Sequence, residues 1–404
     1  MSPLLTQPKQ DLLLQFQQLD QLLLELKPYW QLRPFAEMAL PWTHNPPLLG
    51  YLQQLKPDQV TALEEDMAAR LAALSPFIDN IDALHALINT STLPVNSPVS
   101  VEPLLSYGVP GRKWRQVQAF SAALPQESRP FLEWCAGKGH LGRVLHQVHG
   151  GTVTSLELQA SLCRDGEALA ERHHSSCQMV TCDVLSDAVE PHLSPNQHAV
   201  ALHACGQLHL QLLQRASAKG VERISLSPCC YHLIDSDHYQ PISPSGAASA
   251  LKLTRHDLRL VVQETVTAGA RERRQRNREF HWRLGFDLLQ RQLRGVDDYL
   301  NCPPVPRRVM GGDFAGFCRY MAQRKQLCLQ QPIDYDAFEA RGVERADTVA
   351  RIELVRHLFR RPLELWLVLD RALFLQQQGY SVRLGEFCDY QLTPRNLMIL
   401  ASKG

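Results

Sequence analysis

The feature that most constrains the fold of this chain is a change of hydrophobic period after Pro130. Beyond it, short apolar runs typical of buried strands alternate with segments whose apolar residues recur at helical spacing. The runs that we interpret as strands are 131–134, 152–156, 179–182, 199–203 and 224–227. Strands that alternate with helices build βαβ units, so the pattern predicts an α/β fold with a parallel, doubly wound sheet.

Two further apolar runs, 380–387 and 397–401, stand near the end of the chain and are joined by a connection that contains Pro394. They predict an antiparallel last pair of strands, which a mostly parallel sheet tolerates at its edge. About 150 residues of mainly helical pattern separate this pair from the fifth strand, and that is too long for a single crossover. The sequence therefore predicts a helical insertion within the α/β domain.

The first hundred residues predict helices instead of strands, because their apolar residues recur at helical spacing over 12–26 and 60–74. Ser, Thr and Pro are frequent between 90 and 103, which is typical of a linker. The expected domains are an N-terminal helical domain at 1–104, the α/β domain at 105–262 and 379–404, and the helical insertion at 263–378.

Composition excludes some classes of protein and indicates a compartment. The chain has 42 Lys and Arg against 41 Asp and Glu, so it is not a uniformly basic nucleic-acid coat. Its 11 Cys are odd in number and scattered, which is typical of reduced thiols in the cytoplasm. The sequence predicts neither a signal peptide nor a membrane span, and it does not indicate an oligomeric state.

A glycine-containing turn follows the first predicted strand and opens a helix, over residues 133–140. Gly137 and Gly139 permit a tight turn and a close approach of a ligand to the backbone. Glu157 and Asp183 stand at the ends of the second and third strands, where carboxylates can accept from ribose hydroxyls and from an adenine amino group. The pattern leaves two expected ligands, a dinucleotide or S-adenosylmethionine. Glu133 favours S-adenosylmethionine, because its charge repels a pyrophosphate and attracts a cationic amino group and sulfonium.

These residues resemble a known family. The pattern Glu-x-x-x-Gly-x-Gly-His at 133–140 is similar to motif I of class I methyltransferases. Three further segments narrow the resemblance to one family within this class. They are 201–206, 227–232 and 393–396, which contain His-Ala-Cys-Gly, Cys-Cys-Tyr-His and Thr-Pro-Arg-Asn. The combination covers 105–260 and 380–402. It resembles the methyltransferase-like family that includes the glutathione S-transferase C-terminal-domain-containing protein and the ribosomal RNA adenine dimethylase domain-containing protein.

The resemblance implies a Rossmann-like class I fold, methyltransferase activity and S-adenosylmethionine as the cofactor. The sequence departs from the class I pattern at Cys135, where the first glycine of motif I usually stands. The residues expected to bind the cofactor are Glu133, Cys135, Gly137, Gly139, His140, Glu157, Asp183 and His203.

Cys and His side chains gather at or just past the predicted strand ends: Cys135, His140, His203, Cys205, Cys229, Cys230 and His232. Such groups can bind a soft metal, act as a general base or fill space. The spacing lacks Cys-x-x-Cys, and adjacent Cys229 and Cys230 are expected to point in different directions on an extended chain. The sequence therefore predicts no metal site and favours packing.

The candidate catalytic residues are His203, Cys205, Tyr231 and His232. In this fold class the end of the fourth strand faces the transferred methyl group, which makes His203 the candidate general base. A hydrogen-bonded His203 that orients its loop fits the sequence equally well. Tyr231 and His232 are expected to shape the acceptor pocket.

The helical insertion carries a basic stretch, Arg271–Arg294, with Phe280, Trp282 and Phe286 interleaved. Arg suits phosphate contact and stacking on bases, so the stretch is a candidate RNA interface. A solvated helix face with local Arg–Glu pairs explains the pattern equally well. The sequence thus predicts a methyltransferase whose acceptor is RNA first, a protein second and a small metabolite third. The rival interpretation is a non-catalytic module that binds S-adenosylmethionine.

Overall fold

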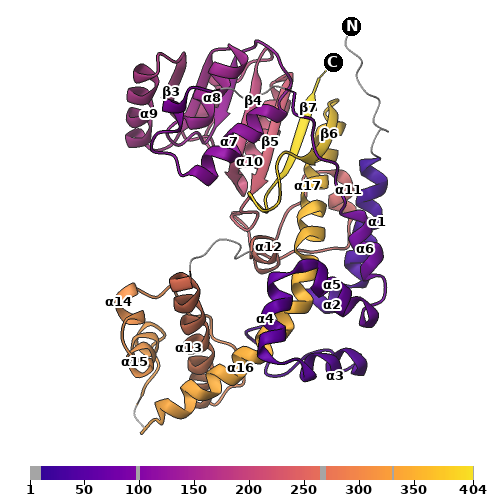
Figure 1. The fold of residues 1–404 in the computed structure, drawn as a ribbon, viewed down its shortest axis with the longest axis vertical. Helices are drawn as coiled ribbons and strands as arrows, with labels where there is room; N and C mark the ends of the chain where they lie inside the picture. Colours follow the sequence, from indigo (N-terminus) through magenta and orange to yellow (C-terminus); the bar gives the residue numbers. More distant parts are fainter. Residues whose placement is uncertain (1–10, 97–100, 264–269, 330–331, 404) are drawn as a thin grey trace. The chain divides into compact units, whose positions relative to one another are not determined.

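The computed structural model describes residues 11–96, 101–263, 270–329 and 332–403, without the side chains of 270–273 (Figure 1). The chain forms two compact units. The sheet unit comprises Met1–Leu24, Ala83–Glu264 and Arg360–Gly404, and the helical unit comprises Glu25–Asp82 and Thr265–Phe359. Among the described residues, no helix is both long and apolar enough to span a membrane.

The sheet unit is built on a seven-stranded sheet with the order β3-β2-β1-β4-β5-β7-β6. The first five strands are parallel, and β7 is antiparallel to both β5 and β6. The strands are β1 (Phe131–Trp134), β2 (Val153–Glu157), β3 (Cys177–Thr181), β4 (His198–Cys205), β5 (Arg223–Cys229), β6 (Ser381–Glu386) and β7 (Leu397–Ser402). This arrangement confirms the predicted doubly wound sheet with an antiparallel last strand.

Helices cover the sheet because its strands are apolar on both sides. Helix α8 packs on β1 and β2 and against α7, whereas α10 packs on β4 and β5 and against α17. The helices of this unit are α1 (Leu12–Glu25), α6 (Ile81–Leu87), α7 (Gly111–Ala123), α8 (His140–His149), α9 (Ala160–Arg172), α10 (Gln207–Ala218), α11 (Pro244–Ala248), α12 (Arg255–Val262) and α17 (Arg360–Gln377). Two short 3-10 helices, η2 (Pro103–Ser106) and η3 (Asp187–His192), complete it.

The compact units differ from the predicted domains at both ends of the insertion. Helix α17 belongs to the sheet unit, where it packs on β6 and β7. Helix α1 belongs there too, because Phe16 lies against the Trp366 ring and Asp20 accepts from Trp366 Nε1 at 2.8 Å. Residues 25–82, which we expected in an independent N-terminal domain, group instead with 265–359. Local periodicity finds helices but does not reveal which helices share a core.

The helical unit is held together by contacts between its two sequence segments. Its helices are α2 (Lys27–Trp30), α3 (Pro46–Gln54), α4 (Pro57–Glu65), α5 (Met67–Leu74), α13 (Ala270–Arg294), α14 (Arg307–Met310), α15 (Phe314–Arg324) and α16 (Tyr335–Arg356), with 3-10 turns η1 (Ser75–Phe77) and η4 (His357–Phe359). The predicted helix over 60–74 is broken at Asp66, which ends α4 and accepts from Ala69 N to cap α5. Arg351 of α16 donates to the carbonyl oxygens of Leu52 and Leu55.

Candidate active site

The loop between β1 and α8 takes the turn that its sequence predicts. Gly137 and Gly139 have φ values of 60° and 65°, and Cys135 also has a positive φ, 57°. Glycine adopts this left-handed region without a steric cost, whereas Cys135 is strained there. Burial raises the pKa of the Cys135 thiol to about 12, so it stays protonated at neutral pH. The loop therefore presents backbone and a neutral thiol at the carboxyl edge of the sheet.

Glu157 joins this loop to the end of β2. Its Oε2 accepts from Gly137 N at 2.9 Å, and its Oε1 accepts from Gln159 N at 3.0 Å. Asp183 follows β3 with an exposed carboxylate, and its Oδ1 accepts from Leu185 N. The carboxyl ends of β1, β2 and β3 thus bring together the glycine loop and the two acids that were expected to bind an adenosyl group.

Glu133 lies beneath the first turn of α8 and is 3% exposed. Its Oε2 accepts from Ser155 Oγ at 2.6 Å and from Gly142 N at 3.1 Å. Burial raises the pKa of this carboxyl to about 7, and the opposing effects of Ser155, Arg143 and Lys113 are smaller. Because this pKa lies near physiological pH, a cation placed beside the carboxyl would change the fraction of Glu133 that is ionised.

His140 begins α8 and serves to hold the loop. Its Nδ1 accepts from Arg143 Nη2 at 2.7 Å, and Arg143 Nη1 donates to Lys138 O. Burial and the Arg143 guanidinium lower the pKa of His140 to about 4, so the imidazole is neutral at physiological pH. A neutral ring in this position supports the loop backbone without repelling a cationic ligand.

His203 stands near the end of β4 with a positive φ of 62°. Its Nε2 lies 3.0 Å from Gln116 Oε1, and Gln116 Nε2 donates to Leu392 O, so His203 is the donor in the pair. Burial lowers the pKa of His203 to about 3, which makes the ring a weak base. This geometry favours the orienting role of His203 over the general-base role.

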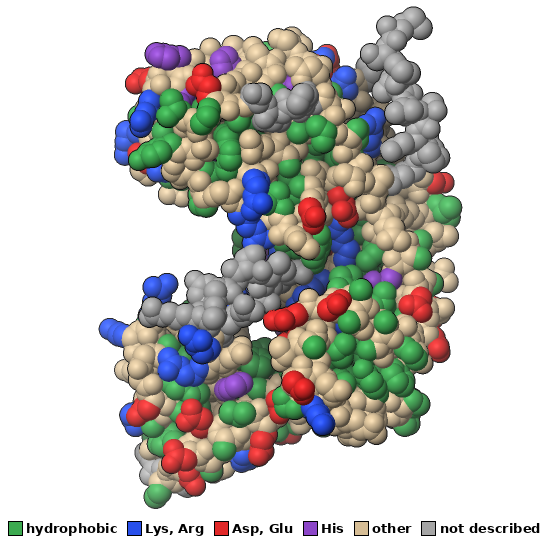
Figure 2. Space-filling model, viewed as in Figure 1, with side chains coloured by type: hydrophobic (Ala, Val, Ile, Leu, Met, Phe, Trp, Pro, Cys, Tyr) green, Lys and Arg blue, Asp and Glu red, His purple; other side chains and the backbone are tan. Residues whose placement is uncertain are grey.

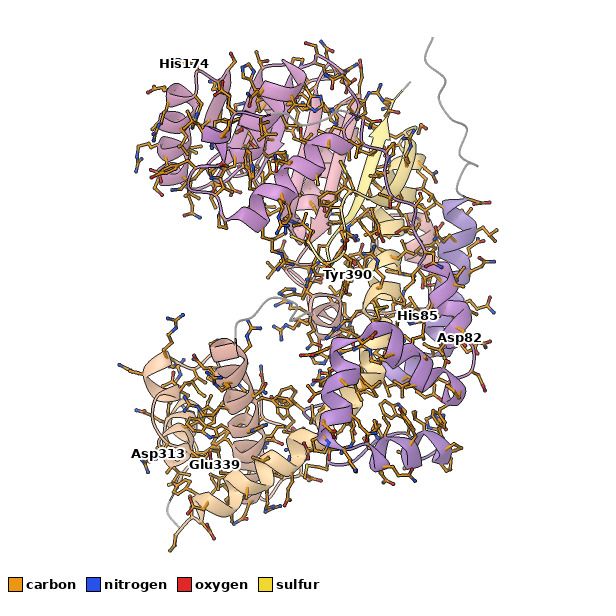
Figure 3. All side chains as sticks on the ribbon, viewed as in Figure 1. Asp82, His85, His174, Asp313, Glu339 and Tyr390 are labelled. Atoms are coloured by element: carbon orange, nitrogen blue, oxygen red, sulfur yellow. The ribbon has the colours of Figure 1, made fainter. Side chains whose placement is uncertain are left out.

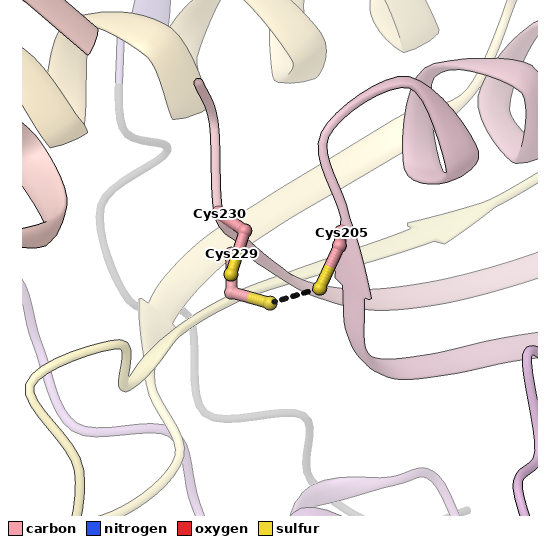
Figure 4. A group of neighbouring side chains, drawn as sticks. All are labelled: Cys205, Cys229 and Cys230. Carbon is pink, nitrogen blue, oxygen red and sulfur yellow. Dashed lines mark hydrogen bonds between the residues drawn. The ribbon is translucent and has the colours of Figure 1, made fainter. Parts of the chain in front are cut away.

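Three thiols converge at the carboxyl ends of β4 and β5 (Figure 4). The Sγ atoms of Cys205 and Cys229 are 3.6 Å apart, and those of Cys205, Cys229 and Cys230 all lie within 4.8 Å of one another. The expectation that Cys229 and Cys230 point apart is therefore wrong. It assumed an extended chain, but Cys230 has a φ of 45°, which turns its side chain back toward its neighbour.

Tyr231 and His232 follow these thiols and have different surroundings. Tyr231 is 1% exposed, and its hydroxyl faces Pro228 O and Glu364 Oε1, both at 3.4 Å, while Arg371 lies over its ring. This buried position against α17 does not fit the expected role in an acceptor pocket. His232 is partly exposed and close enough to Cys230 for an electrostatic interaction.

Lys113 of α7 is a residue at this edge that the sequence analysis missed. Its ammonium interacts electrostatically with Glu133, Cys229 and Cys205, and burial lowers its pKa. It precedes the first strand and belongs to no motif that we recognised. The carboxyl edge therefore holds a cation between the glycine loop and the thiols.

The expected RNA interface in α13 is largely a core. Trp282 and Phe286 are 3% and 0% exposed and pack with Phe314 and Phe317. The Trp282 Nε1 donates to Glu339 Oε1 at 2.6 Å, and Figure 3 labels Glu339 in the helical unit. Phe280 packs edge-on against Phe35. Trp282 and Phe286 are therefore not available to stack on bases, because burying them holds the helical unit together, whereas Phe280 is partly exposed.

Much of the charge in this stretch is paired within the helical unit. Arg283 bonds to Glu279, and Arg291 bonds to Asp287, which is fully buried and also accepts from Arg345. The side chains of Arg271 and Arg273 lie outside the described residues. The exposed cations form what we call the basic patch: Arg274, Arg276 and Arg278 of α13 with Arg307 and Arg308 of α14. Figure 2 shows Lys and Arg gathered over these helices.

Comparison with known proteins relates part of the chain to a family. Residues 112–237 match the family model described as a methyltransferase domain. The solved structures that it resembles include a precorrin-6y C5,15-methyltransferase from Geobacter metallireducens GS-15, at 10% identity and a TM-score of 0.25, over 30% of this chain and 63% of that one. An rRNA methylase from Streptococcus thermophilus matches at 10% identity and a TM-score of 0.24, over 29% of this chain and 71% of that one.

A third structure is geranyl diphosphate C-methyltransferase from Streptomyces coelicolor A3(2), at 14% identity and a TM-score of 0.26, over 38% of this chain and 65% of that one. The chain spans less than two thirds of the length of the first and third of these proteins.

The strand order and the antiparallel seventh strand are those of the class I methyltransferase fold, and residues 112–237 match the model of a methyltransferase domain. S-adenosylmethionine is the cofactor of such a domain. The residues present fit it, because a side chain at Gly137 would meet nothing within 4 Å, which leaves room at the loop backbone, and the Glu157 carboxylate accepts from Gly137 N.

Proposed function

We propose that the protein transfers a methyl group from S-adenosylmethionine to an acceptor at the carboxyl edge of the sheet. The observation that carries the proposal is the junction of the glycine loop with Glu157, where Gly137 N donates to the Glu157 carboxylate. This junction stands where ligands bind in doubly wound sheets.

When bound, S-adenosylmethionine supplies a methyl group on a sulfonium, and in-line attack by the acceptor on this methyl group releases the thioether. Glu157 would accept from the ribose hydroxyls, Asp183 would accept from the adenine amino group, and Glu133 would offset positive charge of the cofactor. His203 and Gln116 fix the loop after β4. Holding the reactants in near-attack geometry contributes about 7–11 kcal/mol in favourable cases, so the site does not require a strong general base.

RNA is the acceptor class that we propose. The support is the basic patch, whose arginines are exposed on two helices that Arg278 links by donating to Met310 O. Exposed guanidinium groups of this kind suit a phosphate backbone. The resemblance of the motifs to the family of the ribosomal RNA adenine dimethylase domain-containing protein points the same way. A protein side chain is the second candidate, and the third is a small metabolite.

Methyl transfer from isotopically labelled S-adenosylmethionine into fractionated cell extract tests this function. The expected label is sensitive to ribonuclease and resistant to protease. Label that protease removes would assign a protein acceptor, and label in the small-molecule fraction would assign a metabolite. A cofactor-binding protein that labels nothing in any fraction would support the non-catalytic module instead.

A further inference from the structure

The thiol cluster of Cys205, Cys229 and Cys230 takes no part in the steps proposed above, and the catalytic role expected of Cys205 stays a prediction. It combines residues from two neighbouring strand ends, so the fold and not the local sequence brings it together. Cys205 and Cys230 are half-buried, and Cys229 is buried. Three soft ligand atoms that meet near a solvent-accessible edge are a donor set typical of a metal site.

The cluster is held by backbone contacts between the two loops that carry it. Gly206 N donates to Cys229 O at 3.1 Å, and Gln207 N donates to Leu233 O at 2.8 Å. A Cβ at Gly206 would lie 1.9 Å from Leu233 O, and the φ of Gly206 is 53°. Both the close approach and the backbone conformation therefore require glycine. Cys230 itself keeps a strained positive φ, and strain of this kind persists where the surroundings hold the residue in place.

The spacing of the sulfurs matches three corners of a tetrahedron. Zinc binds thiolate sulfur at about 2.3 Å, which sets neighbouring sulfurs about 3.8 Å apart. The Cys205 and Cys229 sulfurs are 3.6 Å apart, and the whole set spans at most 4.8 Å. Closing the widest separation to the zinc spacing takes a movement of at most about 1 Å.

We propose that Cys205, Cys229 and Cys230 bind one Zn²⁺ ion as thiolates and leave its fourth position to a ligand from outside the thiol set. Each thiol gives its proton to solvent on binding. Three thiolates and Zn²⁺ carry a net charge of −1, and the nearby Lys113 ammonium offsets it. The sequence argument against a metal relied on the spacing of the cysteines along the chain. It no longer applies, because the fold brings the three sulfurs together in space.

Metal binding by the full chain tests the proposal without using methyl transfer. The reduced protein is stripped with a chelator under argon and titrated with Zn²⁺ against a chromophoric competitor. We expect one equivalent per chain, and an affinity at least tenfold weaker in Cys205→Ser and Cys230→Ser. Cys388→Ser, which changes another half-buried thiol outside the cluster, is the matched control and keeps wild-type affinity.

Cobalt titration of the wild type gives a second measurement that does not depend on variants. Thiolate-to-cobalt charge-transfer absorption with strong tetrahedral d–d bands supports the proposal. Absence of a stoichiometric site in the reduced wild type would overturn it, and so would equal affinity in the cluster variants and the control. Because S-adenosylhomocysteine binding is measured separately, failure of the metal site and failure of the proposed function are distinguishable.

Discussion

Replacing Glu133 by Gln should stabilise the protein in a way that depends on pH. Burial raises the pKa of this carboxyl from 4.5 to about 7, which corresponds to about 3 kcal/mol of unfolding free energy. The folded protein binds the Glu133 proton more tightly than the unfolded chain does. The wild type therefore loses this contribution as pH rises from 4.5 through about 7.

Glutamine cannot ionise, and its side-chain oxygen can still accept from Ser155 and Gly142. The difference in unfolding free energy between Glu133→Gln and the wild type should be near zero at about pH 4 and reach about 3 kcal/mol in favour of the variant at about pH 8. Urea unfolding followed by circular dichroism measures it. Glu167→Gln, on the exposed side of α9, is the control for loss of one charge. A difference that stays constant over this pH range would refute the reasoning.

The same carboxylate should link cofactor affinity to pH. A cationic ligand beside Glu133 favours the ionised form and lowers the pKa of the carboxyl. The affinity of the wild type for S-adenosylmethionine should therefore rise between about pH 6 and about pH 8, whereas that of Glu133→Gln should stay flat. Parallel pH profiles for the two proteins would remove Glu133 from the cofactor site.

Three further outcomes are expected. Glu157→Ala should lower the affinity for S-adenosylhomocysteine about 10- to 100-fold in calorimetry, since hydrogen bonds to a charged group contribute about 1.5–3 kcal/mol; unchanged affinity would contradict the role of Glu157. Trp282→Ala should destabilise the helical unit by about 3–5 kcal/mol in urea unfolding, and a neutral effect would reopen a surface role for this ring. The double variant Arg274→Gln, Arg276→Gln should reduce the slope of log affinity for RNA against log salt concentration by about 0.7–0.9 per lost phosphate contact. An unchanged slope would exclude the basic patch from the RNA interface.

The sheet and the cofactor edge could be predicted from local pattern. Each strand is a short apolar run, and the Gly137 loop and Glu157 are tied to strand ends, so topology alone brings them together. The thiol cluster could not be predicted in the same way. It depends on the positive φ of Cys230, which no spacing rule reveals for a residue other than glycine.

The basic insertion shows why composition misleads. An amphipathic core helix and an RNA-binding helix both alternate Arg with aromatic residues, and only tertiary contacts tell them apart. Trp282 and Phe286 pack inward on Phe317, so the interpretation as a stacking surface failed while the exposed Arg274 and Arg276 remain. Lys113 went unnoticed because a lone lysine on a helix has no local signature.

Calorimetric titration of the full wild-type chain with S-adenosylmethionine and S-adenosylhomocysteine tests the central claim most directly. The account predicts that each ligand binds at one equivalent per chain. Absence of binding by both ligands, in protein whose circular dichroism shows the folded sheet and helices, would contradict it.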